Sequence, residues 1–497
     1  MQEKFYITTA IPYTNAQPHI GFALELIQAD VIARYQRILG KDVFFLTGTD
    51  EHGSKAARVA KEHGKSPREL GDENSAKFLK LCEALNISNS DFIRTTDEHK
   101  HWPSARKMWN ALVSAGDIYK DTYVGKYCVG CEAFLTDKDL ENGLCPIHKC
   151  LPEELKEEDY FFRLSKYQDE LKKLIECDEI RIIPLSRKNE ILAFLNRGLK
   201  DVSFSRPKEK LAWGIPVPDD DSQVIYVWAD ALTNYLSGVG FAEAGAQFQR
   251  FWPPDVQIVG KDISRFHALI WPAMLLSAGV PLYKTLFVHG FITSGGEKMS
   301  KSLGNVVDPF DLILRFGSDA VRYFFTREVP ALDDGDYTEE KFIARYNGDL
   351  ANGIGNLASR IVKLGVLSGR EIAFSPNDLK DTIEQTELKY RAHMEQFQFN
   401  DALAAVSFLI SAGDEYINQN KPWTLSRSID LEEQKKFDAI ISSLAFALGH
   451  SAVLLLPFIP WSAQRILDAL QIVDIHLETW QGKKVKFVQT PALFPRK

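Results

Sequence analysis

KFYITTA at residues 4–10 and VFFL at residues 43–46 are the two apolar runs that decide the fold of this chain. Each is short and rich in residues that favour β-structure, which is typical of buried parallel strands. Between them, residues 21–39 carry an apolar stripe at helical spacing, formed by Ile27, Val31, Tyr35 and Ile38. A strand, a helix and a second strand in this order predict a doubly wound α/β fold with a parallel sheet.

The second predicted strand ends in the polar loop GTDEHG at residues 48–53. The carboxyl ends of parallel strands are where α/β folds bind ligands. Asp50 of this loop is therefore a candidate for binding the α-ammonium group of an amino acid. The alternative is that Asp50 caps the next helix, and His52 has the same two interpretations.

The rest of the chain divides into segments of different pattern. From about Tyr119, short strands, clustered cysteines and the acidic residues 152–159 predict an inserted module. The alternation of strands and helices resumes at residues 224–227, 256–259 and 286–288. Beyond about Glu339 helical periodicity dominates, so we expect a C-terminal helical bundle.

Length and composition bound the class of protein. The 497 residues, of which 45% are hydrophobic and 25% charged, are typical of a soluble globular protein with several domains. The net charge of −8 lacks the basic excess of many nucleic-acid-binding proteins, although a local basic face can bind RNA on an acidic protein. The sequence begins with no apolar signal peptide or Arg-rich transit segment. Pro457 and Pro460 interrupt the apolar residues 440–461, which predicts a buried helix rather than a membrane span.

Cys128 and Cys131, followed after thirteen residues by Cys145 and His148, have the spacing of a zinc knuckle. Four protein ligands leave no open position for water, so we expect one structural zinc ion. Cys150 competes with His148 for the fourth position, and the alternative to a metal site is four unrelated side chains. The chain has six cysteines, and their clustering argues against a disulfide scaffold and favours a reducing cytoplasm.

Two segments far apart in the sequence suit a polyphosphate. PHIG at residues 18–21 lies where the first helix begins, so His19 and backbone N–H groups are placed at a helix N-terminus. KMSKS at residues 298–302 carries two lysines after Gly295 and Gly296, which predicts a mobile cationic loop. Such a loop can stabilise the charge that builds up on phosphate groups during a reaction.

A cluster of aromatic residues is a candidate pocket. Four residues follow a predicted strand at helical spacing: Trp228, Ala231, Leu232 and Tyr235. Phe266 and His267 lie near the carboxyl end of another strand. Singly, these residues are more often core packing than a binding site. Together they suit a long, flexible, apolar side chain such as a thioether, which packs well on aromatic rings.

Three residues of the predicted bundle are candidates for reading an unpaired base. Trp423 follows Lys421 and Pro422, and Asn356 and Arg360 lie one turn apart on a predicted helix. Stacking of a base on Trp, with Asn and Arg bound to its edges, is a known mode of RNA recognition. The alternative is a core tryptophan and an unrelated surface pair.

Taken together, these features resemble the methionyl-tRNA synthetases, class I aminoacyl-tRNA synthetases of the type with a single zinc knuckle, over essentially the whole chain. The matching segments are residues 10–13, 18–21, 48–53, 128–148, 213–216, 226–228, 260–263, 289–290, 298–302, 356–360 and 421–423. The isoleucyl, valyl and leucyl relatives carry a large editing insertion for which this chain has no room. The cysteinyl type places its zinc ligands differently.

The resemblance implies a Rossmann-type parallel-sheet catalytic domain that is split by a zinc-binding insertion and followed by a helical anticodon-binding bundle. The expected boundaries are residues 1–118 and 223–291 for the two halves of the catalytic domain, 119–222 for the insertion, 292–343 for the linker with the lysine loop, and 344–497 for the bundle.

The resemblance also implies roles for individual residues. ATP would be contacted by His19, Gly21, Asp262, His289, Lys298, Ser300 and Lys301, of which His19, Lys298 and Lys301 would be catalytic. The methionine site would be formed by Ala10, Ile11, Tyr13, Asp50, Trp228, Ala231, Leu232, Tyr235, Ile263 and His267, with Asp50 on the ammonium group. Asn356, Arg360 and Trp423 would read the CAU anticodon.

The implied activity is that of a methionine–tRNA ligase, which makes methionyl-adenylate from methionine and ATP and then esterifies the 3′-terminal adenosine of tRNA. The implied partners are Mg²⁺ with ATP, one structural Zn²⁺, and the initiator and elongator forms of tRNA(Met). The chain stops soon after the bundle, without the appended tRNA-binding and dimerisation module of some relatives, so we expect a cytoplasmic monomer without membrane contact.

One position departs from the family pattern. Phe22 stands where the first signature usually has a second histidine, which helps to stabilise the pentacoordinate phosphate. Loss of one such hydrogen bond typically costs about 2.7–4 kcal/mol of barrier. We expect an active enzyme in which backbone N–H groups and the lysine loop compensate. The alternatives are a slow or non-catalytic tRNA-binding paralogue and an adenylating enzyme with another small acceptor.

Overall fold

The computed structural model describes residues 2–129, 133–135, 139–147, 149–299, 305–476 and 480–497. The chain forms two compact units. The sheet unit consists of Met1–Pro18, Lys41–Glu83 and Ser88–His289. The helical unit consists of His19–Gly40, Ala84–Ile87 and Gly290–Lys497. The first helix of the α/β pattern therefore belongs to the helical unit.

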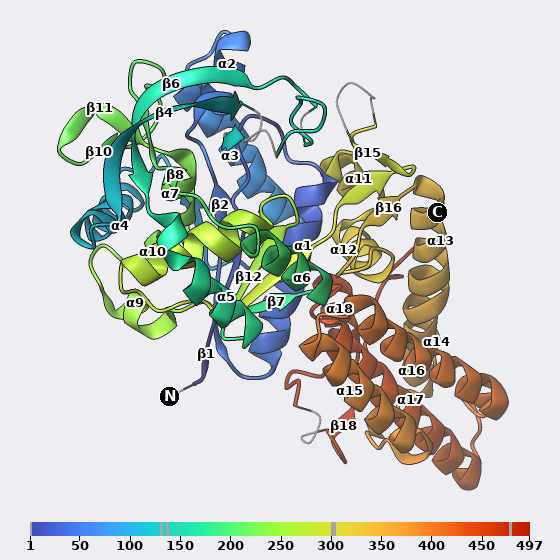
Figure 1. Ribbon diagram of the computed structural model, residues 1–497. Helices are drawn as coiled ribbons and strands as arrows, with labels where there is room; N and C mark the ends of the chain where they lie inside the picture. Colours follow the sequence, from blue (N-terminus) through green and yellow to red (C-terminus); the bar gives the residue numbers. More distant parts are fainter. Residues whose placement is uncertain (1, 130–132, 136–138, 148, 300–304, 477–479) are drawn as a thin grey trace. The chain divides into compact units, whose positions relative to one another are not determined.

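The centre of the sheet unit is a parallel sheet (Figure 1). Within the described residues six strands form it, in the order β3 (Asp91–Arg94), β2 (Asp42–Thr49), β1 (Lys4–Thr9), β12 (Val256–Gly260), β13 (Thr285–His289) and β7 (Arg181–Ile183). Ile7 pairs with Phe45 on one side and with Val256 on the other. The predicted parallel α/β sheet is confirmed, and the predicted strands at residues 4–10, 43–46, 256–259 and 286–288 all belong to it.

Two segments of the sheet unit differ from the sequence-based expectation. Val224 and Ile225 end β11 (Asp220–Ile225), which pairs antiparallel with β9 (Ser205–Pro207) and β10 (Pro216–Val217) outside the parallel sheet. A short apolar run has the same pattern in both kinds of sheet, so periodicity alone could not distinguish them. Conversely, β7 comes from the segment predicted as insertion and extends the parallel sheet beside β13.

The cysteine-containing segment connects the two long strands of an antiparallel ribbon. Its long strands are β4 (Ile118–Cys128) and β6 (Glu153–Phe162), flanked by β5 (Ala133–Leu135) and β8 (Val202–Ser203). Figure 1 shows β4 and β6 as one curved ribbon. The remaining helices of the sheet unit include α2 (Ser54–Glu62), α3 (Pro67–Ala84), α4 (Trp102–Ser114), α5 (Gln168–Glu176), α6 (Leu185–Leu195), α7 (Val227–Leu232), α8 (Asn234–Ser237), α9 (Ala246–Phe251) and α10 (Trp271–Ser277).

The helical unit begins with α1 (Ile20–Ile38), close to the predicted residues 21–39. Its Asp30 forms an ion pair of 2.7 Å with Arg322 of α12 (Ser318–Arg327), and both side chains are fully buried. Arg322 also donates hydrogen bonds to the carbonyl oxygens of Pro457 and Phe458. A buried guanidinium needs such partners because an unpaired charge is costly. This set of bonds fixes α1 to the end of the C-terminal helices.

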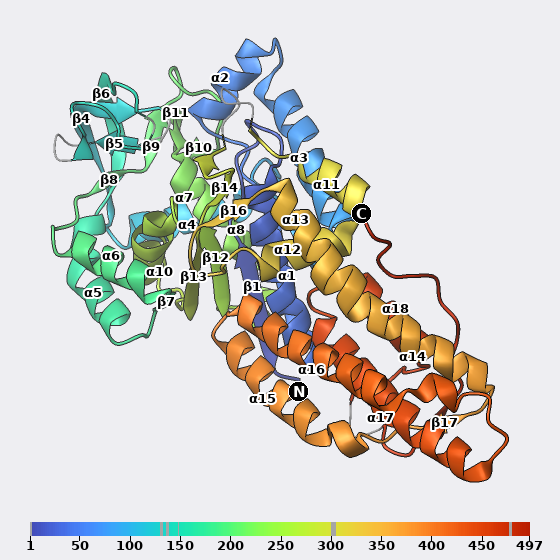
Figure 2. The same ribbon diagram turned by 90° about the vertical axis from the view of Figure 1, so that its right-hand side faces the viewer.

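The C-terminal part of the unit is a helical bundle, as predicted. Its helices are α13 (Glu339–Arg345), α14 (Gly355–Ser368), α15 (Lys380–Glu395), α16 (Phe399–Asn420), α17 (Leu431–Leu455) and α18 (Pro460–Ala469). Figure 2 shows α15, α16 and α17 side by side. Within the described part of the chain, α17 alone is long and apolar enough to cross a membrane, yet 89% of its most apolar stretch is buried in the bundle. The prediction of a buried helix there is confirmed.

A small hairpin precedes the lysine loop. β14 (Ile292–Ser294) pairs with β15 (Glu297–Lys298) through a two-residue turn, and β16 (Gly335–Tyr337) lies on the other side of β14. Gly295 and Gly296 form the turn with φ of 63° and 80°. Two successive positive φ angles favour glycine at both positions. After β15 comes α11 (Pro309–Phe316).

Candidate functional site

The loop at residues 48–53 lies beside the segment that follows β1. Tyr13 and Asp50 form an isolated parallel bridge, with Asp50 N donating to Pro12 O at 2.9 Å and Thr14 N donating to Asp50 O at 3.0 Å. Asp50 is buried. Ala10 N in turn donates to Ile258 O of the next strand. The structure therefore brings four of the predicted methionine-site residues together, namely Ala10, Ile11, Tyr13 and Asp50.

His267 is the polar centre of the aromatic cluster. Its Nε2 lies 2.7 Å from the hydroxyl of Tyr235, and its Nδ1 lies 3.0 Å from the carbonyl oxygen of Ile263. Burial lowers the pKa of His267 to about 4, so the imidazole is neutral near pH 7. A carbonyl oxygen can only accept, so Nδ1 carries the proton and Nε2 accepts from Tyr235. The Tyr283 hydroxyl also donates to the His267 carbonyl oxygen at 2.7 Å.

Trp228 joins this histidine to the Asp50 side of the site. The Trp228 ring stands edge-on to Tyr13 with centroids 6.5 Å apart and edge-on to His267 at 6.4 Å. It is stacked on Phe266 at 3.6 Å, a contact that the sequence pattern did not single out. Ala231 and Leu232 are buried on the same helix, α7. All ten predicted methionine-site residues thus belong to the sheet unit. Direct contacts join Tyr13, Trp228, Tyr235, Ile263 and His267.

A buried network of hydrogen bonds lies beside the aromatic cluster, and it was not predicted from the sequence. Asp230 of α7 accepts from His52 Nδ1 and from His101 Nε2, both at 2.6 Å. His101 Nδ1 lies 3.0 Å from the Ser237 hydroxyl. Burial by itself would raise the pKa of Asp230, but the charges and hydrogen bonds of His52 and His101 outweigh it and hold the pKa below its usual value. Asp230 is therefore a carboxylate.

Glu51 anchors the same loop from another direction. Its carboxylate is fully buried and accepts from Arg94 Nε at 2.6 Å and Arg94 Nη2 at 2.7 Å, a two-point ion pair. Thr49 and Thr96 donate their hydroxyls to the same group. A buried carboxylate that is fully hydrogen-bonded is a rigid anchor. The backbone on both sides of Asp50 is therefore held in place.

Two candidates for ATP binding lie at the ends of adjacent strands of the parallel sheet. Gly260 ends β12 and pairs in register with His289, which ends β13. A Cβ atom placed on Gly260 would lie 2.8 Å from Asp262 Oδ1 and 3.7 Å from His289 Nε2. The structure therefore places Asp262 and His289 together at the carboxyl edge of the sheet, where α/β folds bind ligands.

Residues 19–21 of the first signature segment lie beside the hairpin that leads to the second, and both belong to the helical unit. His19 is the N-cap of α1, and its Nδ1 accepts from the backbone N–H of Gly21 at 3.0 Å. A Cβ atom on Gly21 would lie 3.8 Å from the side chain of Ile292, where the hairpin to Lys298 begins. Phe22 is buried in the first turn of α1. The Lys298 backbone pairs with Thr293, whereas Ser300 and Lys301 lie outside the described residues.

The described part of the zinc knuckle holds three cysteines. Cys128 and Cys145 are fully buried, and Cys128 Sγ lies 3.8 Å from Cys150 Sγ. The backbone N–H of Cys145 donates to Cys150 O at 2.9 Å, which closes a tight loop. Cys131 and His148 lie outside the described residues, and in the described part no group of three or more His, Cys, Asp or Glu side chains is placed to hold a metal.

The predicted RNA-reading residues lie together on the bundle. The Arg360 guanidinium is 5.9 Å from the centre of the Trp423 ring, and Trp423 is 47% exposed. Arg360 also forms an ion pair of 2.9 Å with Asp414 and donates to Asn418 Oδ1 at 2.6 Å. These two residues of α16 were not predicted. Asn356 is exposed one turn before Arg360 on α14. The arrangement leaves an indole face beside hydrogen-bonding groups at the surface.

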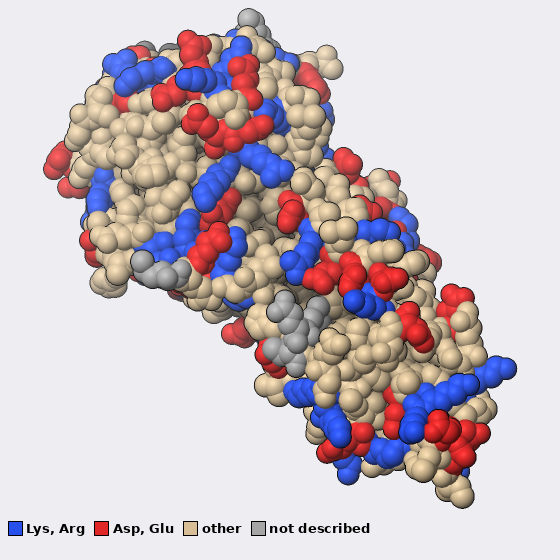
Figure 3. Space-filling model, turned by 90° about the horizontal axis from the view of Figure 1, so that it is seen from below, with Lys and Arg blue, Asp and Glu red and all other residues tan. Residues whose placement is uncertain are grey.

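The distribution of surface charge does not by itself mark this site. On the face shown in Figure 3, basic and acidic side chains are interspersed, as the net charge of −8 leads one to expect. Long-range attraction to a polyanion is weak on such a surface. Specific side chains such as Arg360 and Trp423 are therefore better guides to an RNA site than the overall charge.

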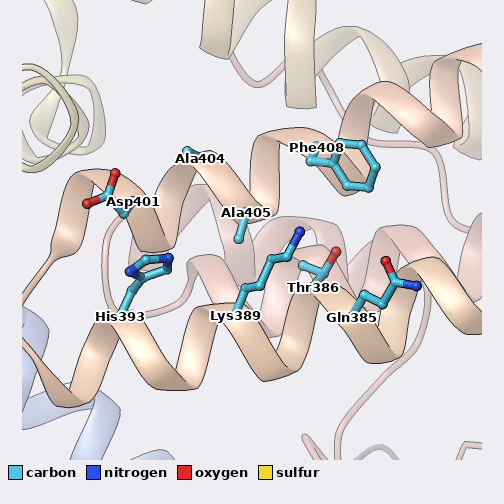
Figure 4. Close-up of a pocket in the computed structure, with 8 residues that line it drawn as sticks. All are labelled: Gln385, Thr386, Lys389, His393, Asp401, Ala404, Ala405 and Phe408. Carbon is cyan, nitrogen blue, oxygen red and sulfur yellow. The ribbon is translucent and has the colours of Figure 1, made fainter.

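One cavity of the helical unit lies apart from all predicted site residues. It has a volume of about 270 Å³ between α15 and α16. Figure 4 shows Lys389 and His393 of α15 facing Asp401 and Phe408 of α16 across it. Charges of both signs line it, and none of the residues predicted for ATP, methionine, RNA or metal does. The cavity is not part of the candidate site.

Comparison with known proteins agrees with this geometry. The family model described as class I tRNA synthetases (M) matches residues 5–153 and 137–362, and the anticodon binding domain of methionyl tRNA ligase matches residues 366–492. The methionine–tRNA ligase of Brucella suis is 44% identical over 95% of this chain and 92% of its own length. That of Thermotoga maritima is 41% identical over 96% of this chain and 77% of its own length.

Solved structures are equally similar. Mycobacterium tuberculosis methionyl-tRNA synthetase in complex with methionyl-adenylate superposes with a TM-score of 0.94 at 39% identity, over 99% of this chain and all of the other. The free form of that enzyme superposes with a TM-score of 0.88 at 36% identity.

Proposed function

The chain belongs to the methionyl-tRNA synthetase family. From that premise we propose which of its side chains bind methionine, ATP, the anticodon and zinc. The activity is that of a methionine–tRNA ligase. Methionine's carboxylate attacks the α-phosphate of ATP, which gives methionyl-adenylate and pyrophosphate. A hydroxyl of the 3′-terminal adenosine of tRNA then displaces AMP. No side chain becomes covalently attached, so catalysis rests on positioning and charge stabilisation.

The methionine subsite is the neighbourhood around His267. We propose that Asp50 binds the ammonium group and that Tyr13, Trp228, Tyr235 and His267 surround the thioether side chain. Ala10, Ile11, Ala231, Leu232 and Ile263 complete the apolar wall. The observation that carries this proposal is the contact of Trp228 with both Tyr13 and His267, which joins the Asp50 loop to the aromatic cluster. A thioether packs favourably on ring edges.

The ATP subsite uses groups from both signature segments. His19 and Gly21, at the N-terminus of α1, suit a phosphate group because backbone N–H groups and the helix dipole favour negative charge there. Lys298 and Lys301, with Ser300, would hold the pyrophosphate as it leaves. Asp262 and His289 would contact the adenosine. Mg²⁺ would accompany the triphosphate.

Substitution of Phe22 tests whether this chain is an active enzyme with the proposed ATP subsite. A family match over the whole chain disfavours a non-catalytic tRNA-binding paralogue. We expect Phe22→His to change the rate of aminoacylation by less than about tenfold, because the backbone N–H groups of α1 and the lysine loop carry most of the phosphate charge. A wild type with only background activity, rescued about a hundredfold or more by Phe22→His, would instead support the paralogue.

The anticodon subsite is the Arg360–Trp423 surface. Asn356, Arg360 and Trp423 would read the CAU anticodon of initiator and elongator tRNA(Met). The exposed indole offers a stacking face, and the hydrogen bonds of Arg360 to Asp414 and Asn418 hold its guanidinium beside that face. Stacking on Trp with base edges bound by Asn and Arg is consistent with how proteins read unpaired RNA bases.

One structural zinc ion would be held by Cys128, Cys131, Cys145 and His148, with Cys150 as the competing ligand. Thiolates bind tetrahedral zinc at about 2.3 Å, so two of them lie about 3.8 Å apart. The Cys128–Cys150 separation of 3.8 Å equals that distance. Such an ion would cross-link the loop at the tip of the β4–β6 ribbon and would take no part in the reaction.

The proposed cellular form is a cytoplasmic monomer. Cys82, Cys128, Cys145, Cys150 and Cys177 are unbridged, which suits a reducing compartment. Light scattering coupled to size-exclusion chromatography measures the mass directly. A mass of one 56.2 kDa chain is expected, and twice that mass would contradict the monomer.

A further inference from the structure

One carboxylate joins the two sides of the proposed methionine subsite. Asp230 has no exposed surface, and each of its two oxygens accepts one imidazole N–H at 2.6 Å. His52 belongs to the same loop as Asp50, two residues further along. Asp230 lies on α7 between Trp228 and Ala231. A single rigid group therefore connects the loop that would bind the ammonium group to the helix that would contact the side chain.

His101 extends this set of hydrogen bonds from Asp230 to helices α4 and α8. His101 is the N-cap residue of α4, and its second nitrogen lies 3.0 Å from the Ser237 hydroxyl of α8. The Ser237 oxygen is also 3.0 Å from the carbonyl oxygen of Thr233. The hydroxyl has one proton, so it donates either to Thr233 or to His101.

His52 is held on its other side by aromatic packing. Its ring lies 5.2 Å from the ring of Trp213 and 6.2 Å from that of Trp102. The Trp213 indole donates to the backbone oxygen of Glu51 at 2.5 Å. With its ring packed and its Nδ1 bound to a buried carboxylate, His52 has little rotational freedom, and the backbone next to Asp50 shares that restriction.

We propose that Asp230 is a positioning residue that sets the placement of Asp50 relative to Trp228 and thereby the affinity for methionine. The proposal rests on the assignment of Asp50 and Trp228 to the methionine site. Asp230 would touch no substrate and would act through His52 and α7. The hydrogen bonds of Asp230 lead to His52 and His101, and through His101 to Ser237, and none of these residues is assigned to the ATP subsite. Loss of the Asp230 carboxylate should therefore weaken methionine binding selectively.

The test uses the full-length enzyme and methionine-dependent exchange of pyrophosphate with ATP. Asp230→Asn keeps the shape but puts an amide N–H opposite an imidazole N–H. The KM for methionine should rise at least about tenfold, while the KM for ATP stays within about twofold. His52→Leu should do the same. His52→Asn should recover most of the affinity, because its amide nitrogen replaces Nδ1 as the donor.

Asp117→Asn is the matched control. Asp117 is a buried carboxylate of the sheet unit that accepts from Lys166, Tyr167 and Ser277, none of which is assigned to the proposed methionine subsite. Its replacement should lower the melting temperature without changing the KM for methionine.

Three results would overturn the inference. One is a methionine KM within about twofold of wild type in folded Asp230→Asn. Another is a parallel rise of both KM values, and a third is equal behaviour of His52→Leu and His52→Asn. If Asp50→Asn and Trp228→Ala raise the methionine KM while Asp230→Asn does not, only the positioning role fails. If none of the three variants does, the methionine-site assignment itself fails.

Discussion

The hydroxyl of Tyr235 donates a 2.7 Å hydrogen bond to Nε2 of His267 in the buried centre of the proposed methionine subsite. This bond fixes the neutral tautomer of the histidine, whose other nitrogen donates to Ile263. The two rings are thereby held in one orientation beside Trp228. If methionine binds here as proposed, removal of this hydrogen bond has a measurable consequence for methionine binding.

Tyr235→Phe should raise the KM for methionine about tenfold, because a buried nitrogen of His267 loses its partner at a cost of about 1–3 kcal/mol. The measurement is methionine-dependent pyrophosphate exchange. Tyr283→Phe is the matched control, since that tyrosine donates to the backbone oxygen of the same histidine. The control should lose stability but keep its methionine KM. Equal KM values in Tyr235→Phe and wild type would contradict the assignment.

Trp423→Ala should lower kcat/KM for aminoacylation of tRNA(Met) by about tenfold or more, because stacking of a base on an aromatic ring contributes about 1–3 kcal/mol. Pyrophosphate exchange without tRNA should be unchanged. Trp461→Ala provides the comparison, since Trp461 is another exposed tryptophan of the helical unit, 64% accessible. If both variants charge tRNA as well as wild type does, Trp423 does not read the anticodon.

Zinc content and the absorption of the cobalt-substituted protein together test the two candidates for the fourth ligand. We expect His148→Ala and Cys150→Ser each to retain one zinc per chain, since either residue can complete the set with three thiolates. The double variant should lose the metal. In the cobalt-substituted protein, His148→Ala should gain thiolate-to-metal absorption relative to wild type. Loss of zinc from His148→Ala alone would contradict the expectation that Cys150 can replace His148.

His450→Leu should reduce the sensitivity of the enzyme to acid. Both ring nitrogens of His450 are buried in α17 without a hydrogen-bond partner among the described residues, and burial lowers its pKa to about 4. The unfolded chain takes up this proton below about pH 6.5, so stability is lost as the pH falls from there towards 4, on the order of 3 kcal/mol in all.

The check is thermal unfolding at pH 7 and pH 5. Wild type should lose more stability between the two than His450→Leu, and some loss should remain because His267 is buried in the same way. His99→Leu, at an exposed position, should behave like wild type. An identical pH dependence of wild type and His450→Leu would contradict this account.

The parallel sheet and the helical bundle were predictable because apolar runs and helical periodicity are local signals. Residues 4–10 and 43–46 lie in adjacent parallel strands, as expected. The direction of pairing was not predictable where the run was short, as at Val224 and Ile225, because parallel and antiparallel strands share the same pattern. β7 has three residues, too few for any periodicity to emerge.

Some residues of the candidate site were likewise predictable from the sequence, and others were not. Tyr235 and His267 carry recognisable chemistry and were singled out from the sequence, and family resemblance supplied Ala10 and Ile11. The supporting groups Asp230 and His101 were not found, since they lie 129 positions apart and only the fold brings them within 2.6 Å. Asn418 was missed for the same reason, since it meets Arg360 across two helices.

The central claim is that this chain activates methionine with ATP in the pocket around His267. The most direct measurement is pyrophosphate exchange by the purified, zinc-replete protein with methionine, and with isoleucine, leucine and cysteine as controls. The account predicts exchange with methionine alone, and a higher methionine KM in Tyr235→Phe. Folded protein that binds ATP but exchanges with none of the amino acids would contradict it.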